Sequence, residues 1–300
     1  MADGRGAVIE VFCPERVQLG EGPVWDARTE TLYWVDIVGG TVLSQTRTAA
    51  KPDRVQLGVQ VGCLGLTTDP DVLVAGMRSG WHLLAPRTGA RHFIADPEAD
   101  RESCRFNDGG VDPGGRFWTG SLEDREATPD GRLYTLHGDG RYTVADEGFF
   151  CSNGIDWSPD GRSMYFVDSR QDVIFRYAFD VGSGRVTGRS VFVDTTALSG
   201  IPDGLRVDAA GDVWCAFWDG AHLTRFSPDG TVVERVPVPV IRPTSIAFGG
   251  PDLRTMYITS AAHGLTDEQR QRWPLSGTVL HRQVQTPGSP AHHFETTGTV

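Results

Sequence analysis

One short pattern recurs six times along the chain of 300 residues, and this repeat limits the fold more than any other feature of the sequence. Each copy has an apolar strand end, a polar turn and a second strand, and most of the turns are rich in Asp, Pro or Gly. The third copy, for example, reads Val-Asp-Pro-Gly-Gly-Arg-Phe-Trp and ends at Trp118. The copies begin about 45 residues apart, at Trp25, Thr68, Val111, Trp157, Val207 and Phe248.

A repeat of this length with four short strands is typical of one blade of a β-propeller. Six such units account for roughly 270 residues, and no linker separates any part of the chain. We therefore predict an all-β fold, a six-bladed β-propeller of four-stranded blades, with residues 1–300 as a single domain. The 37 glycines and 18 prolines disfavour a helical bundle. A β-sandwich is the rival fold, but it does not require turns at a fixed period.

The two ends of the chain are expected to meet in the last blade. A closed propeller leaves no long exposed sheet edge, and a strand from the N-terminus can complete the final sheet. We predict that a strand near Val8–Phe12 joins the sheet that carries Met256–Thr259 and Val279–Arg282.

The register of the repeat predicts which residues meet at the central channel. In a closed propeller, equivalent positions of the innermost strands surround one axis. Four of the six residues at one such position carry an acid or amide oxygen. The six aligned positions are Glu21, Leu64, Asn107, Asn153, Asp203 and Thr244.

These converging oxygen atoms are the kind of ligand that a divalent cation prefers. Glu21 and Asp203 bring two negative charges, and the two asparagines add neutral carbonyl oxygens. Ca²⁺, Mg²⁺ and Mn²⁺ favour such hard donors, and Zn²⁺ and Fe²⁺ are further options. The simpler alternative is that these polar groups hydrogen-bond to one another or to trapped water. Because two carboxylates in one register would repel each other, we favour a single divalent metal.

Charge and cysteine content restrict the partners and the compartment. The formal net charge is −11 and there is no basic block, which argues against a nucleic-acid partner. No apolar leader and no run of 18 apolar residues is present, so we expect no membrane partner. The five cysteines are scattered without a CxxC pair, which favours buried thiols over disulfides or a zinc site. We predict a soluble cytoplasmic protein, either a monomer or a weak homo-oligomer.

Four segments around these residues resemble a known family. The segments are Leu19–Asp26, Arg105–Gly109, Ser152–Trp157 and Ile201–Leu205. They are similar to signature segments of the senescence marker protein, regucalcin and gluconolactonase family, and the likeness extends from Glu10 to about Phe294. The resemblance implies a six-bladed propeller lactonase with one divalent metal. It also implies that the metal ligands are Glu21, Asn153 and Asp203, and that Arg105 and Asn107 contact a sugar lactone.

One acidic segment leaves the substrate contact open. Members of this family often place an acidic residue shortly after the pair that matches Gly120–Ser121, and this chain offers Glu123, Asp124 and Glu126 there. We select Glu123 as the substrate-binding acid, with the other two as alternatives.

The chemistry of these residues fits hydrolysis of a cyclic ester. A cation can polarise the lactone carbonyl while a carboxylate takes the proton from an attacking water. Asp203 is our candidate for this catalytic base. Arg105 can bind sugar hydroxyls or the developing oxyanion. The expected substrate is an aldonolactone such as gluconolactone, xylonolactone or arabinonolactone.

Two other functions fit the same inventory of residues. One is a phosphotriesterase-like or other ester hydrolase on the same fold. The other is a non-enzymatic propeller that binds calcium as a regulator or serves as a protein-interaction module. Such a module should tolerate the loss of Arg105, whereas an enzyme should not.

Overall fold

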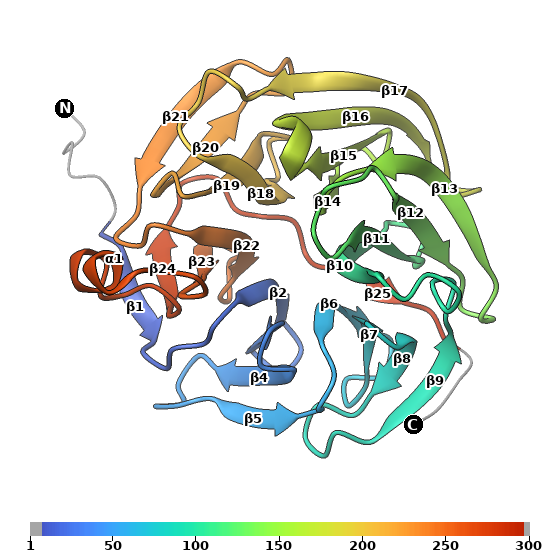
Figure 1. Ribbon diagram of the computed structural model, residues 1–300, viewed down its shortest axis with the longest axis horizontal. Coiled ribbons are helices and arrows are strands. Elements are labelled where there is room, and N and C mark those ends of the chain that lie inside the picture. The colour runs from blue at the N-terminus through green and yellow to red at the C-terminus, as the bar shows by residue number, and fades with distance from the viewer. Residues whose placement is uncertain (1–7, 297–300) are drawn as a thin grey trace.

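The computed structural model describes residues 8–296, which form a ring of six β-sheets around a central axis (Figure 1). The predicted all-β, six-bladed propeller is confirmed. Within the described residues, the helical elements are α1 (Asp267–Arg272) and the short 3₁₀ turn η1 (Ser169–Gln171). None of the described helices is both long enough and apolar enough to span a membrane.

The first three blades follow one another along the chain, each as an antiparallel meander. Their strands are β2 (Gly20–Asp26), β3 (Thr31–Asp36), β4 (Thr41–Thr46) and β5 (Asp53–Gln56); β6 (Val61–Thr67), β7 (Leu73–Met77), β8 (Gly80–Leu84) and β9 (Arg91–Ala95); and β10 (Cys104–Val111), β11 (Phe117–Glu123), β12 (Gly131–Leu136) and β13 (Tyr142–Phe149).

The last three blades repeat this arrangement, and the sixth takes its outermost strand from the start of the chain. Their strands are β14 (Ser152–Trp157), β15 (Ser163–Asp168), β16 (Val173–Asp180) and β17 (Arg185–Asp194); β18 (Ile201–Val207), β19 (Val213–Trp218), β20 (His222–Phe226) and β21 (Val232–Pro237); and β22 (Pro243–Gly249), β23 (Thr255–Ser260), β24 (Val279–Gln283) and β1 (Glu10–Cys13).

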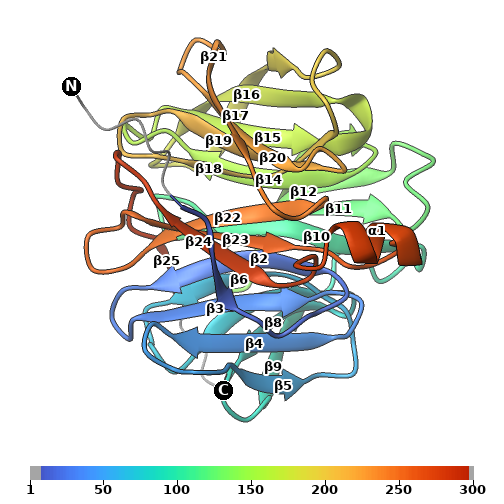
Figure 2. The ribbon, with the colours of Figure 1, turned by 90° about the vertical axis from the view of Figure 1, so that its left-hand side faces the viewer.

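Both ends of the described chain help to close the ring. Strand β1 pairs antiparallel with β24, with Glu10 opposite His281, which confirms the predicted closure. The sequence did not predict a fifth strand in the second blade, where β25 (His293–Phe294) pairs in parallel with β6. The segment that leads to β25 crosses the ring at one end, and α1 lies at the other end (Figures 1 and 2).

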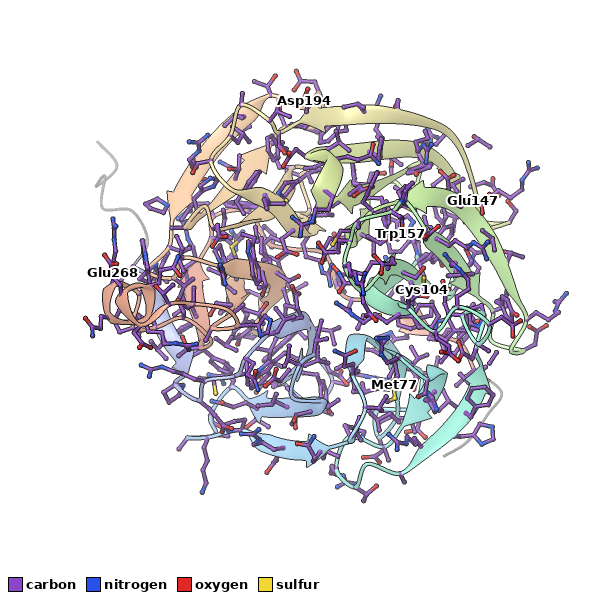
Figure 3. The ribbon with its side chains drawn as sticks, in the orientation of Figure 1. Met77, Cys104, Glu147, Trp157, Asp194 and Glu268 are labelled. Carbon is purple, nitrogen blue, oxygen red and sulfur yellow. The ribbon has the colours of Figure 1, made fainter. Side chains whose placement is uncertain are left out.

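The hydrophobic core lies between neighbouring blades rather than inside one central cluster. Each of the six apolar clusters combines residues from two adjacent sheets. Trp157 on an innermost strand lies in the interior, whereas Glu147 and Asp194 on outer strands lie at the rim (Figure 3). The five cysteines are buried and free, as their scattered positions predicted.

The innermost strands determine where polar side chains can meet. In every blade the strand beside the axis is the first along the chain of that blade's meander, as Figure 1 shows for β2, β6, β10, β14, β18 and β22. These strands therefore all begin at one end of the channel and finish at the other.

In each of two blades, an aspartate at the equivalent position stabilises the turn between the first two strands. Asp208 is fully buried; its Oδ2 accepts a hydrogen bond from Trp214 Nε1 at 3.0 Å, and its Oδ1 accepts two from backbone N–H groups of the turn. Asp112 makes the same bond to Trp118 Nε1, at 2.8 Å. Asp208 accepts from two part-buried turn donors and from an indole donor that would otherwise be buried without a partner.

We predict that Asp208→Ala destabilises the fold strongly because it leaves a buried indole donor and two part-buried backbone donors without their acceptor. The free energy of unfolding should fall by about 3 kcal/mol, as measured by urea denaturation. Asp229 is a matched control, because it occupies an exposed turn of the same blade and accepts from Thr231 N. Asp229→Ala should leave the denaturation midpoint close to that of the parent, and equal losses in the two variants would contradict this role.

Candidate active site

A pocket of about 470 Å³ opens at the end of the channel where the innermost strands begin. Its lining comes from all six blades and is rich in oxygen and nitrogen atoms. The polar lining residues include Glu21, Gln60, Arg105, Asn107, Asp124, Glu126, Asn153, Ser169, Arg170, Asp203 and His263.

Bulges in the innermost strands turn the site residues toward the axis. Pairing is interrupted between Phe106 and Gly109, between Ser152 and Ile155, and between Pro202 and Leu205. Asn107, Asn153 and Asp203 lie inside these interruptions, and Glu21 borders the corresponding one in β2. A β-bulge redirects a side chain at the end of a strand. The repeat thus brings together residues that are far apart in sequence.

A continuous set of hydrogen bonds links the polar lining. Arg105 Nη1 donates to Asn107 Oδ1 at 2.8 Å, and Asn107 Nδ2 donates to Asn153 Oδ1 at 2.9 Å. Asn153 Nδ2 in turn donates to Ser169 Oγ at 2.8 Å. Four residues from two blades therefore hold one another in place.

The two carboxylates at the centre of the pocket are buried and only partly compensated. Glu21 and Asp203 are 6% and 5% exposed, and Asp203 Oδ1 has no hydrogen-bond partner within the described part of the chain. Burial, followed by the nearby charge of Asp108, raises the pKa of Glu21 to about 8. Burial and then Glu21 raise the pKa of Asp203 well above its usual range. The protein alone therefore disfavours two negative charges here, and a bound cation would offset them.

Asp108 is a buried carboxylate of the channel that the sequence analysis missed. It is 3% exposed, and its Oδ2 has no hydrogen-bond partner among the residues that the structure describes. Its pKa is raised by burial, against the lowering effect of Arg206. A signal for it exists in the repeat, because Gly22, Gly154 and Gly204 occupy the equivalent position in three other blades. Asp108 replaces the glycine that those three blades have at this position, and this difference is the signal in the sequence.

The acidic segment that begins at the last residue of β11 contributes two of its three acids to the pocket. Asp124 and Glu126 line the pocket, and Glu123 does not. Glu123 Oε2 instead accepts hydrogen bonds from Arg125 N and Ala127 N and so closes the turn. Glu123, selected as the substrate-binding acid, thus lies outside this pocket, whereas both alternatives line it.

Salt bridges hold the two acids that line the pocket. Glu126 pairs with Arg170 at 2.5 Å, and Asp124 lies 3.8 Å from Arg105 Nε and also pairs with Arg78. Their carboxylates are thus fixed at the rim of the pocket.

The register differs from expectation in the second blade, whereas in the sixth Thr244 lies inside the pairing interruption between Pro243 and Ile246, as predicted. Leu64 lies at the opposite end of the channel, and Gln60 lines this pocket instead. The pairing shift in β6 falls between Val61 and Cys63, so the weak second copy of the repeat was aligned too late along the chain. Thr244 is fully buried and donates to Gly20 O, which ties the last blade to the first.

The residues present fit a divalent cation held by oxygen atoms. Within residues 8–296, no three His, Cys, Asp or Glu side chains are arranged to hold a metal by themselves. A site here therefore needs the amide oxygen of Asn153 beside Glu21 and Asp203. Asp203 Oδ1 is an unpartnered acceptor in this set. Burial raises the pKa of Cys151 well above its usual value, so its thiol stays neutral and is a poor ligand.

A larger cavity of about 950 Å³ lies at the opposite end, where the innermost strands finish and the segment before β25 crosses. Its lining includes Asp156 and Arg206. Asp156 accepts from Trp157 N at 2.9 Å and Val207 N at 2.7 Å, and Arg206 Nη1 donates to the carbonyls of Ile155 and Leu205. Hydrogen bonds to backbone groups thus occupy both charged side chains of the larger cavity. The smaller pocket is therefore the better candidate for the active site.

Comparison with known proteins gives a consistent result. Residues 19–262 match the family model described as SMP-30/Gluconolactonase/LRE-like region. The 6-deoxy-6-sulfogluconolactonase of Pseudomonas putida is 37% identical over 90% of this chain and 92% of its own length. A pentonolactonase of Haloferax volcanii is 36% identical over 85% of this chain and 84% of its own. A crystal structure of a calcium-binding protein, regucalcin, from Agrobacterium tumefaciens superposes with a TM-score of 0.92 at 28% identity, covering 96% of this chain and 97% of that one.

We predict that Asp203→Ala and Glu21→Ala each weaken divalent-metal binding by at least about 100-fold, since each removes a negatively charged ligand. Calorimetric titration of chelator-treated protein with Mn²⁺ measures the affinity. Glu123→Ala is the control, because its carboxylate lies outside the pocket and should leave the affinity unchanged. Equal affinity in Asp203→Ala and the parent would rule out this ligand set.

Proposed function

The chain belongs to the SMP-30/gluconolactonase/LRE-like family and is a lactonase, and from this premise we propose that it opens a sugar lactone to the aldonic acid with the help of one divalent metal. The relatives named as a sulfogluconolactonase, a pentonolactonase and an L-arabinolactonase support a sugar lactone as the substrate class. We propose an aldonolactone such as gluconolactone, xylonolactone or arabinonolactone.

One observation carries this proposal. Two buried carboxylates and an amide oxygen converge beside a partly buried arginine in a pocket large enough for a sugar ring. Glu21, Asn153 and Asp203 would hold the cation. When bound, the cation supplies Lewis-acid polarisation of the lactone carbonyl. The donors favour Ca²⁺, Mg²⁺ or Mn²⁺, with Zn²⁺ and Fe²⁺ as alternatives, and the calcium-binding regucalcin structure is consistent with a divalent ion.

Arg105 would stabilise negative charge on the substrate. Burial lowers the pKa of its guanidinium, but an arginine remains charged in proteins. One nitrogen, Nη1, is committed to Asn107 Oδ1 and Phe106 O, which fixes the plane of the group. Its remaining donors can bind the carbonyl oxygen as it becomes an oxyanion. Asp124 and Glu126 at the rim can accept hydrogen bonds from sugar hydroxyls.

Asp203 would move the proton during hydrolysis. In the ionised carboxylate, Oδ1 has no hydrogen-bond partner among residues 8–296 and can accept a proton from water as the water oxygen adds to the carbonyl carbon. The ring C–O bond then breaks, and the same proton passes from Asp203 to the departing ring oxygen. The product is a hydroxy acid, which ionises and releases one proton to solution.

Binding of calcium without turnover is a second candidate function, because the Agrobacterium tumefaciens relative is described as a calcium-binding protein. The same three ligands would serve it.

We further propose that the protein acts on small molecules in the cytoplasm, as one domain and as a monomer or weak homo-oligomer. The buried free thiols and the net charge of −11 are consistent with this setting.

We predict that the metal-loaded protein releases protons from glucono-, galactono-, xylono- or arabinono-lactone faster than the spontaneous reaction. The assay follows pH-indicator absorbance with chelator-treated protein to which single metals are added back. Turnover should return with at least one divalent metal. Tight calcium binding without acceleration of any lactone would instead support the second candidate.

We predict that Asp203→Asn separates metal binding from proton transfer. Asparagine keeps an oxygen ligand of nearly the same shape but lacks a basic oxygen, so kcat at full metal occupancy should fall by about 10² to 10⁴-fold. Elemental analysis of the same sample checks the occupancy. A fully loaded variant that turns over within a few-fold of the parent would mean that Asp203 is a ligand only.

A further inference from the structure

The hydrogen bonds across the pocket form a chain. The groups at its two ends determine which atom donates and which accepts at every bond between them. At one end, Arg105 can only donate, so the atom it contacts at 2.8 Å must be the oxygen of Asn107. Asn107 Nδ2 also contacts the carbonyl oxygen of Ser152 at 2.8 Å, which can only accept. Both contacts require the same orientation of the Asn107 amide.

The far end of the chain is fixed by a backbone carbonyl. Ser169 Oγ lies 2.6 Å from the carbonyl oxygen of Pro202, so its single proton is used there. The hydroxyl can then only accept from the next group, and that group is Asn153 Nδ2 at 2.8 Å. The amide oxygen of Asn153 must therefore point away from Ser169, toward Asn107 and the pocket.

Ser169 is well placed to impose this orientation. It is 6% exposed and begins the η1 turn, and its backbone N–H donates to Cys151 O at 3.0 Å. Its acceptor, the Pro202 carbonyl, belongs to the peptide bond that precedes Asp203. One hydroxyl thus contacts the side chain of one proposed metal ligand and the backbone next to another.

We propose that Ser169 is a positioning residue of the metal site: it fixes the amide of Asn153 so that the oxygen, rather than the nitrogen, faces the cation. This inference rests on the proposed metal-dependent function. Without the hydroxyl, Asn153 Nδ2 loses its oxygen acceptor and keeps only the weak contact to Cys151 Sγ at 3.7 Å, so the flipped amide, which presents NH₂ to a cation, becomes more populated. Groups that orient metal ligands in this way commonly change metal affinity by about 10- to 100-fold.

The test compares variants that separate the hydroxyl from its volume. Threonine keeps the hydroxyl, and valine has nearly the same shape without it. Calorimetric titration with Mn²⁺ should give an affinity for Ser169→Thr near that of the parent, and a loss of about 10- to 100-fold for Ser169→Val and Ser169→Ala. The melting temperature of the metal-free protein is recorded for each variant, and a purely structural role would lower it without separating Thr from Val.

A second comparison keeps the inference testable if the extra methyl group of Thr and Val prevents folding. Ser245 is a fully buried serine on innermost strand β22, and its hydroxyl has no hydrogen-bond partner between residues 8 and 296. Ser245→Ala should bind Mn²⁺ like the parent, while Ser169→Ala should not. Equal affinities in Ser169→Val and Ser169→Thr, or in Ser169→Ala and Ser245→Ala, would overturn the role of Ser169. A parent that binds Mn²⁺ but opens no lactone would contradict the proposed function and not this assignment.

Discussion

Closure of six twisted sheets into one ring is the constraint on which the rest of this structure depends. Because the innermost strands surround one axis and begin at the same end, each blade can place one side chain at the mouth of the channel. The bulges near these strand starts then aim Asn107, Asn153 and Asp203 inward. The position of the site therefore follows from the propeller architecture. For most site residues, the blades differ only in the type of polar side chain at the equivalent position.

Buried carboxylates from different blades lie close together in the channel. Glu21, Asp108 and Asp203 are all buried, and the pKa values of all three are raised chiefly by burial. The positive charge of Arg206, on the other side of the channel, lowers the pKa values of Glu21 and Asp108 and so partly offsets the effect of burial. A divalent cation at the mouth would complete this balance, which links affinity for the metal to the protonation of the carboxylates.

Much of this arrangement could be predicted from the sequence, because a repeat carries its own register. The six blades, the closure by the N-terminal strand and the convergence of Glu21, Asn107, Asn153 and Asp203 all follow from the period. Glu123 could not be distinguished from Asp124 and Glu126, since the path of a loop depends on local hydrogen bonds such as those from Arg125 N and Ala127 N.

Two kinds of information lie outside a repeat pattern. Leu64 was misplaced because a single shift of pairing in β6 changes the register of one blade without changing the period. Ser169 gave no signal, since it follows β15 rather than lying on an innermost strand, and its importance comes only from two hydrogen bonds to other segments.

The pairing of β1 with β24 also determines the order in which the protein can be completed during synthesis. The first strand leaves the ribosome early, but its partner around His281 follows only after roughly 270 more residues, on the order of tens of seconds later at usual rates. Five blades are local in sequence and can form in the meantime, whereas the sixth is a long-range sheet. A nascent chain thus has an open ring whose last gap closes only after β24 has been made, and until then the proposed metal site has its candidate ligands but not its full enclosure.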